Sequence, residues 1–190
     1  MKLIDVVQLT NSEYLNMYKL KLINRANNPK DYFVASRRKK EDLTCISKKH
    51  DKCDGVMILA ITENDEAVIL KQYRPAIGDY LYELPAGMID PNEELEVAAK
   101  RELFEETGLK CEEYKLILKP SYSSVGISDE TTAIVKMKVS GNVSLVNNEE
   151  DEEIEVFLIK KEEVKDYVNN HRFSLKSALI LLSIQCLSDS

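Results

Sequence analysis

The chain lacks any apolar run long enough to cross a bilayer as a helix. Its longest apolar segment, Val56 to Ile61, is far shorter than the roughly eighteen residues that such a helix requires, and it suits a buried strand. The first residues include the charged Lys2 and Asp5 and lack the apolar block of a signal peptide. We therefore expect a cytoplasmic protein that does not interact with a membrane.

Glycine and proline are also scarce, with 6 and 5 residues among 190. No segment is of low complexity and no internal repeat is present, so long disorder and repeat architectures are not expected. The length suffices for one domain with a substantial core and a small terminal extension.

Closely spaced cysteine pairs are missing. The four cysteines, Cys45, Cys53, Cys111 and Cys186, are scattered along the chain without a C-x-x-C pair. This spacing favours free thiols in a reducing compartment over a zinc site or a disulfide framework.

Excess positive charge is absent as well. The formal net charge of -7 argues against nonspecific nucleic-acid binding, which depends on neutralising phosphates. A local exception is the basic stretch from Arg37 to Lys40, followed by Lys48 and Lys49. It reads either as a solvated loop or as the wall of a pocket for an anionic small molecule.

Alternation and turn residues predict the elements that are present. A strand, a turn at Asn27 to Pro29 and a second strand are expected within residues 14–35. Further strands are expected at 56–61, 67–72, 80–84, 114–118, 132–139 and 155–159, and helices from 93 or 94 to 107, at 161–169 and at 174–187. This irregular alternation predicts a mixed sheet with helices on its faces. Asp90 or Asn92 is expected to cap the first helix, and Gly108 to end it in the left-handed conformation.

Helical geometry places three acids of the first helix toward its core-facing side. At about 100° per residue, Leu95 lies at the centre of an apolar stripe that includes alanines on either side of it. On the same count Glu102 and Glu106 fall within about 20° of Leu95, and Glu105 about 80° away.

These acids repel one another, and the C-terminal half of a helix disfavours negative charge. Arg101 offsets part of the cost, but one guanidinium cannot neutralise three carboxylates. A divalent cation can, because hard cations such as Mg²⁺ take oxygen ligands. The alternative is a surface helix whose acids simply face water.

The segment GMIDPNEELEVAAKRELFEETGL, from Gly87 to Leu109, resembles the Nudix box, G-x5-E-x7-R-E-U-x-E-E-x-G-U, where U is apolar. Every fixed position matches: Gly87, Glu93, Arg101, Glu102, Leu103, Glu105, Glu106, Gly108 and Leu109. The resemblance implies a Nudix-type α/β/α sandwich with a mixed sheet over residues 51–190. Residues 1–50 are expected to form a small N-terminal antiparallel strand extension that serves dimerisation.

In the Nudix family, the box binds a divalent metal against the diphosphate of the substrate. The resemblance implies that the catalytic residues Glu102, Glu105 and Glu106 are metal ligands, together with the backbone carbonyl of Ala86, and that the metal is Mg²⁺ or, in its place, Mn²⁺. It implies structural roles for the remaining motif residues Gly87, Glu93, Arg101 and Gly108.

Segments outside the box resemble the ADP-ribose pyrophosphatase branch of this family. Lys71 to Arg74 and Tyr82 to Gly87 look like the segments that precede the box there, which implies that Arg74 and Glu83 contact substrate or metal. Downstream, Glu130 fits the branch as a metal or substrate ligand. Val125 departs from the pattern, because many ADP-ribose hydrolases carry proline at that position.

Two further roles follow from the same branch. Glu150, in the acidic run from 149 to 153, is the expected general base, although its acidic neighbours leave the register open. The N-terminal strands commonly exchange between two subunits, which implies a homodimer in which Tyr32 or Phe33 stacks on a base and Arg37 or Arg38 reaches the base or its phosphates.

The expected reaction is hydrolysis of ADP-ribose, or a related nucleoside diphosphate sugar, to a nucleoside monophosphate and a sugar phosphate. One alternative keeps the chemistry and changes the substrate to a dinucleotide, a nucleoside triphosphate or a coenzyme. A second alternative is a nucleotide-sensing module that binds without cutting. The complete set of box acids favours catalysis.

Overall fold

The computed structural model describes residues 1–145 and 153–186 as two compact units. One unit comprises Met1–Asp54 together with Pro120–Thr132, and the other comprises Gly55–Lys119 together with Ala133–Ser190. Each is described by itself below. No helix in the described part of the chain is long and apolar enough to span a membrane.

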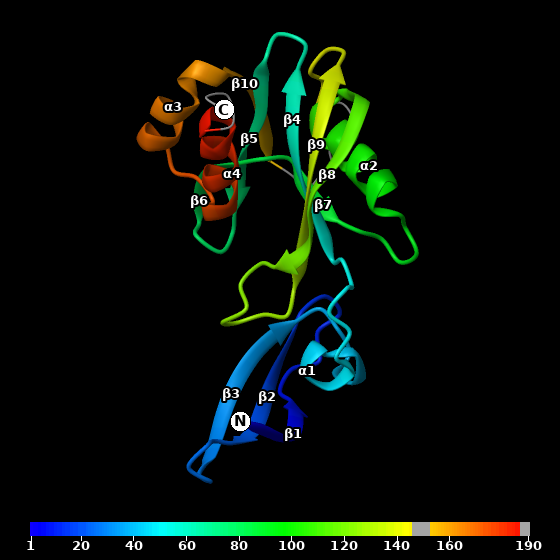
Figure 1. Cartoon of the computed structure of the whole chain (residues 1–190), viewed down its shortest axis with the longest axis vertical. Helices are drawn as coiled ribbons and strands as arrows, with labels where there is room; N and C mark the ends of the chain where they lie inside the picture. The colour runs from blue at the N-terminus through cyan, green and yellow to red at the C-terminus, as the bar shows by residue number, and fades with distance from the viewer. Residues whose placement is uncertain (146–152, 187–190) are drawn as a thin grey trace. The chain divides into compact units, whose positions relative to one another are not determined.

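A seven-stranded sheet forms the centre of the second unit (Figure 1). Its main path runs β10-β5-β4-β9-β8, while β6 pairs with β5 and β7 pairs with β4. The strands are β4 (Gly55–Thr62), β5 (Glu66–Arg74), β6 (Asp79–Glu83), β7 (Ala86–Met88), β8 (Lys110–Tyr122), β9 (Thr131–Ser140) and β10 (Ile154–Lys160). Strands were expected in each of these regions except β7, whose three residues are too short to show a period.

Strand β4 shows why helices cover both faces of this sheet. Its apolar run alternates, so that Val56 and Ile58 pack into one core cluster and Met57 and Leu59 into another. The first cluster includes Leu103 of α2 (Leu95–Thr107). The second includes Val164, which begins α3 (Val164–Asn170) after a short 3₁₀ turn, η2 (Lys161–Glu163), and Leu181 of α4 (Leu175–Cys186).

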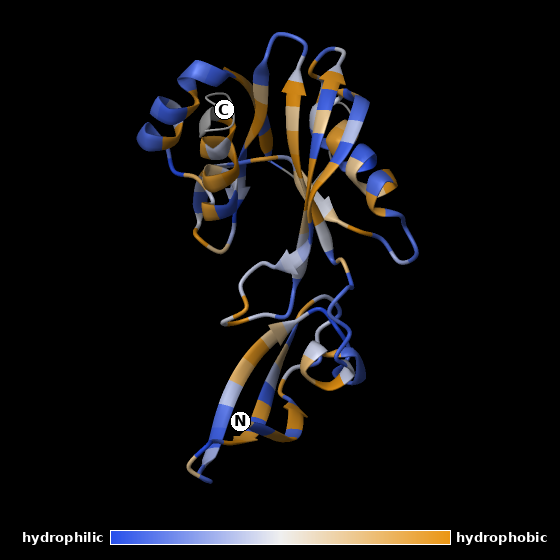
Figure 2. Cartoon of the chain, in the orientation of Figure 1, coloured by the Kyte–Doolittle hydropathy of each residue, from blue (hydrophilic) through white to orange (hydrophobic). Residues whose placement is uncertain are grey.

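The resulting architecture is an α/β/α sandwich. Figure 1 shows α2 on one side of the sheet and α3 and α4 on the other, and Figure 2 shows the apolar central strands between them. The predicted fold class is confirmed.

The first unit contains a second, antiparallel sheet in the order β1-β2-β3. Its strands are β1 (Lys2–Gln8), β2 (Asn16–Ile23) and β3 (Pro29–Ser36), of which β2 and β3 were expected. Tyr18, Leu20 and Leu43 are buried beside it in a small core cluster. The charged stretch that follows forms a 3₁₀ turn, η1 (Lys40–Asp42), and one short helix, α1 (Thr44–Ser47).

Segment 120–132 belongs to this first unit although it lies far along the chain. The Ala35 N–H donates to the Ile127 carbonyl at 2.8 Å, and Ala35 forms a parallel bridge with Ser128. The Asp129 carboxylate accepts from the Ser36 hydroxyl at 2.6 Å and from the Thr44 N–H at 2.9 Å. The loop that follows the box is therefore fixed onto β3 and α1.

A buried ion pair lies at the centre of this unit. Arg38 donates from Nη2 to Asp54 at 2.6 Å, and the Thr131 N–H donates to the same carboxylate at 3.0 Å. Burial by itself would raise the pKa of Asp54, but the hydrogen bonds from Arg38 and Thr131 outweigh burial and hold that pKa below the ordinary value of 3.8. The stabilisation is therefore complete above pH 3.8 and is lost as the pH falls through the lower folded-state pKa.

Replacing Asp54 by asparagine should destabilise the protein by about 3–5 kcal/mol at neutral pH, because the buried Arg38 guanidinium would lose its nearer carboxylate and keep only Asp129, at 3.8 Å. Urea unfolding followed by circular dichroism measures the change. Asp42→Asn is the matched control, since Asp42 is exposed, and it should leave stability nearly unchanged. Equal stability of the two variants would show that the pair contributes little.

Candidate active site

The site begins where β6 connects to β7, in a segment that we call the 84–87 loop (Leu84 to Gly87) and that includes the first two residues of β7. The Pro85 carbonyl accepts from the Ile58 N–H of β4 at 2.8 Å, and the Ala86 N–H donates to Oε2 of Glu106 at 3.0 Å. Glu106 is only 3% exposed, so its carboxylate lies inside the interface between α2 and this loop. The prediction that this acid faces the core is confirmed.

Gly87 leaves the space that the next acid occupies. A Cβ built on Gly87 would lie 1.9 Å from Cδ of Glu102 and 2.1 and 2.2 Å from its two carboxylate oxygens. The Glu102 carboxylate therefore rests directly on the Gly87 backbone. Any residue with a side chain at position 87 would displace this acid, which explains why glycine is required there.

Arg101 organises the remaining acids. Its guanidinium donates to both oxygens of Glu93, at 3.0 and 2.9 Å, and its Nη1 donates to Glu102 and Glu105 at 2.9 Å each. A further hydrogen bond, from Nη2 to the Met88 carbonyl at 3.1 Å, connects the arginine to the end of β7. The structural roles expected for Glu93 and Arg101 agree with these contacts.

The pKa shifts follow from the same contacts. Hydrogen bonding to Glu93, together with the charges of Glu102 and Glu105, raises the pKa of Arg101 above its ordinary value despite partial burial. The hydrogen bonds from Arg101 lower the pKa of Glu93. Three carboxylates, those of Glu93, Glu102 and Glu105, thus gather around one guanidinium that stays charged, and the cluster keeps a net negative charge when all three are ionised.

The start of α2 differs from the sequence expectation. The capping residue is Glu94, which makes no side-chain capping bond, rather than Asp90 or Asn92. Asn92 instead adopts a left-handed conformation with φ of 68°, and Glu93 accepts from the Asp90 N–H at 3.0 Å. Gly108 ends the helix in the left-handed conformation, as predicted.

The donor set suits a hard divalent cation, because it consists of carboxylate oxygens beside a backbone cradle that admits no side chain. Within the described residues, however, no group of three or more His, Cys, Asp or Glu side chains converges well enough to hold a metal ion. Glu102 and Glu105 turn to Arg101, while Glu106 turns to Ala86. Joint ligation by these three acids therefore requires their side chains to rotate away from their present donors.

Arg74 and Glu83 pair across the β5–β6 ladder. Nε of Arg74 donates to Oε2 of Glu83 at 2.6 Å, and the Glu83 side chain is only 14% exposed. The contact brings together two residues that were expected to bind substrate.

The candidates from the first unit form separate pairs. Arg37 contacts Glu130 at 3.6 Å, and the Tyr32 hydroxyl donates to the Gly126 carbonyl. Phe33 is half exposed. Arg38, considered as an alternative to Arg37, is buried in its pair with Asp54 and does not provide a binding surface.

Other residues fall outside the sequence predictions or outside the described part of the chain. Glu150 lies beyond the described residues, so its expected role stays a prediction. The buried Arg38–Asp54 pair and the buried hydroxyl of Ser177 were missed. A basic run and a serine in an apolar helix are both common on surfaces, so neither carried a distinguishing signal.

Gly87→Ala should keep the fold but weaken Mn²⁺ binding at least about tenfold, because the new methyl group displaces the Glu102 carboxylate. Electron paramagnetic resonance of free Mn²⁺ measures the affinity, and thermal unfolding monitors the fold. Gly126→Ala is the matched control, since a Cβ at that position meets nothing within 4 Å. Unchanged Mn²⁺ affinity in Gly87→Ala would rule out Glu102 as a ligand.

Comparison with known proteins agrees with the box geometry. The chain is 31% identical over 122 residues to a methanol dehydrogenase activator of Bacillus methanolicus, covering 62% of this chain and 64% of that protein. It is 30% identical over 136 residues to an ADP-ribose pyrophosphatase of Bacillus subtilis, covering 69% and 71%. For the first three curated relatives, the matched segment spans between 48% and 64% of their own length.

A solved structure supports the fold over the whole chain. The crystal structure of an ADP compounds hydrolase superimposes with a TM-score of 0.76 at 18% identity and covers 100% of this chain and 95% of the other. The NUDIX domain description matches residues 51–178, which include the 84–87 loop, α2 and the strands around them. The chain therefore belongs to the NUDIX domain family.

Proposed function

We propose that the chain hydrolyses the diphosphate bond of ADP-ribose or a related nucleoside diphosphate sugar in a Mg²⁺-dependent reaction. The products would be a nucleoside monophosphate and a sugar phosphate. The observation that carries this proposal is the acid cluster of α2, in which Glu106 contacts the Ala86 N–H and Glu102 lies on Gly87. A cluster with this net charge would repel a diphosphate unless a cation lay between them.

Glu102, Glu105 and Glu106, with the Ala86 carbonyl, are the proposed ligands of the cation. When bound, a divalent cation would neutralise phosphate oxygens and make an attacking water more acidic. Glu102 and Glu105 would turn from Arg101 to the cation, while the hydrogen bonds of Arg101 to Glu93 and to the Met88 carbonyl would keep the arginine beside them. Glu150, outside the described residues, is proposed to accept the proton of the attacking water.

The substrate-binding role is proposed for two ion pairs and one aromatic residue. Arg74, which pairs with Glu83, presents a guanidinium that suits bidentate phosphate recognition. Arg37, which pairs with Glu130, and Tyr32 are further substrate-binding residues of the proposal, as the resemblance to the ADP-ribose pyrophosphatase branch implies. Similarity to an ADP-ribose pyrophosphatase supports an adenosine diphosphate derivative as the substrate.

A different nucleoside diphosphate derivative is the main alternative. Val125, which is 71% exposed, stands where many ADP-ribose hydrolases carry proline. A dinucleotide, a nucleoside triphosphate or a coenzyme would use the same acids, and only the contacts to the rest of the molecule would change. A sensing module that binds without cleavage is the less favoured alternative, because the box acids are complete.

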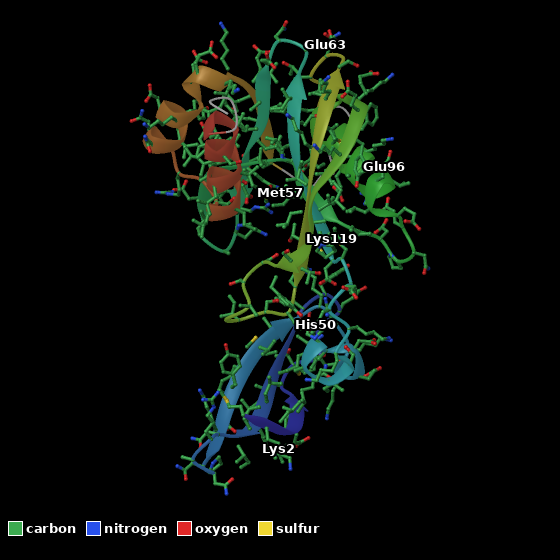
Figure 3. All side chains as sticks on the ribbon, viewed as in Figure 1. Lys2, His50, Met57, Glu63, Glu96 and Lys119 are labelled. Carbon is green, nitrogen blue, oxygen red and sulfur yellow. The ribbon has the colours of Figure 1, made fainter. Side chains whose placement is uncertain are left out.

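With Mg²⁺, the purified chain should release AMP from ADP-ribose faster than it cleaves dinucleotides or nucleoside triphosphates. Glu105→Gln and Glu106→Gln should each lower kcat on the order of 100-fold or more, because charge on the phosphate would be less well stabilised. Glu96→Gln is the matched control. Glu96 (labelled in Figure 3) lies on the same helix but is exposed and pairs with Lys100 at 2.6 Å. Chromatography of the products measures the activity of the wild type and of the three variants.

Several outcomes distinguish the proposed activity from its two alternatives. Faster cleavage of another compound would keep the mechanism and change the substrate. Tight metal-dependent binding without cleavage would support the sensor. Glu150→Gln, compared with Glu149→Gln, tests the proposed base by the acidic limb of the pH profile. If both variants keep the acidic limb, Glu150 is excluded as the general base.

The first unit is also proposed to make a homodimer through its sheet. Phe33 is 52% exposed on β3, and Met17, which pairs with Ala35 from the neighbouring strand β2, is 37% exposed. Sedimentation equilibrium should give twice the chain mass of 21.7 kDa. Phe33→Glu should weaken the assembly, whereas Lys30→Glu, on an exposed residue of the same strand, should not. A wild-type monomer at micromolar concentration would overturn the proposal.

A further inference from the structure

Leu84, at the start of the 84–87 loop, is held by a side chain from the opposite helix layer. Its N–H donates to Oγ of Ser177 at 2.9 Å. Leu84 is 1% exposed and Ser177 is 0% exposed, so the contact is shielded from water. Ser177 belongs to α4, which packs on the face of the sheet that α2 does not cover.

The local sequence explains why Leu84 needs this acceptor. The β5–β6 ladder ends at the pair of Leu70 with Glu83, so the Leu84 N–H has no strand partner there. Pro85 keeps Leu84 extended and has no N–H of its own. A buried N–H must find an acceptor, and Ser177 provides it.

Ser177 is itself fixed in place. The Ser174 hydroxyl donates to Oγ of Ser177 at 2.9 Å, and the Ser174 N–H donates to the Tyr82 carbonyl at 3.1 Å. The Tyr82 N–H in turn donates to the Arg172 carbonyl at 2.8 Å. Two backbone hydrogen bonds of Tyr82 therefore join β6 to the segment that leads into α4, next to the Leu84 contact.

Three different elements consequently hold three successive residues of the loop. Leu84 bonds to Ser177 of α4, Pro85 accepts from Ile58 of β4, and Ala86 donates to Glu106 of α2. Ala86 lies two residues beyond Leu84, and Gly87 follows directly. A shift of Leu84 toward or away from α4 would move the backbone on which Glu106 and Glu102 rest.

We propose that Ser177 is a positioning residue for the metal loop, acting through Leu84 to set where Ala86 and Gly87 meet the acids of α2. The inference rests on the proposed function for its catalytic meaning. Its structural content is that Ser177 of α4 holds Leu84, two residues before the Ala86 backbone that donates to Glu106 of α2.

Mn²⁺ binding to the full-length protein tests this, measured by electron paramagnetic resonance of free Mn²⁺. Ser177→Ala should bind Mn²⁺ about tenfold more weakly, or about 1.4 kcal/mol. Ser177→Thr, which keeps a hydroxyl, should restore most of the affinity. Ser183→Ala is the matched control, since Ser183 lies on the same helix, is exposed and donates to the Ile180 carbonyl of that helix. It should bind Mn²⁺ as the wild type does.

Amide hydrogen exchange identifies the site of the change. In Ser177→Ala the Leu84 amide should exchange faster, while amides near Leu103 in the α2 core keep their protection. An open Leu84 amide with unchanged Mn²⁺ affinity would overturn the proposal. So would a general loss of protection that includes Leu103, or a failure of Ser177→Thr to restore binding, since either result indicates packing alone.

The outcome is separable from that of the proposed function. If the wild type cleaves ADP-ribose but Ser177→Ala binds Mn²⁺ normally, the positioning role fails and the activity stands. If the wild type cleaves no member of the panel but Ser177→Ala loses Mn²⁺ affinity, the activity fails and the positioning role stands.

Discussion

Repulsion among the carboxylates of α2 is the constraint on which the rest of this site depends. Helical spacing brings Glu102, Glu105 and Glu106 together against a sheet, where charge is costly to bury. Three features accommodate these acids in the structure: one guanidinium, one backbone N–H and one glycine. Arg101 donates to Glu102 and Glu105, the Ala86 N–H donates to Glu106, and Gly87 leaves room for the Glu102 carboxylate. Each of these features fixes the position of an acid, and the cluster of carboxylates keeps a net negative charge.

This constraint accounts for the short strand β7 and the loop before it. A carboxylate as buried as Glu106 needs a donor, and a backbone N–H can serve only if the strand ladder does not already use it. Ala86 pairs with Met57 in the β4–β7 ladder, but its N–H donates to Glu106 of α2. The β5–β6 ladder ends before Leu84, so the buried Leu84 N–H also needs an acceptor. Ser177, from the other helix layer, provides it. The site thus draws on both helix layers of the sandwich.

The sequence predicted the parts of this arrangement that repeat with a short period. The continuous apolar run of β4, the acid stripe of α2 and the left-handed Gly108 are all local properties, and the structure has them. The box added structural roles for Glu93 and Arg101, and the structure shows that these residues, 8 apart in the sequence, form an ion pair. The prediction that Asp90 or Asn92 caps α2 was wrong. Glu93 accepts hydrogen bonds from Arg101 and from the Asp90 N–H, and the turn before α2 therefore follows the ion pair rather than the capping preference.

What the sequence could not provide were partners distant along the chain. Arg38 meets Asp54 and Asp129 through segments that only the folded unit brings together, and a run of basic residues gives no sign of which member is buried. Ser177 lies 93 residues from Leu84, in an apolar helix where a single serine reads as incidental. In both cases a buried polar group needs a partner that no local pattern can supply, because tertiary packing alone decides which donor and acceptor meet. Such residues become recognisable only when each buried N–H and charge of the fold is traced to its partner.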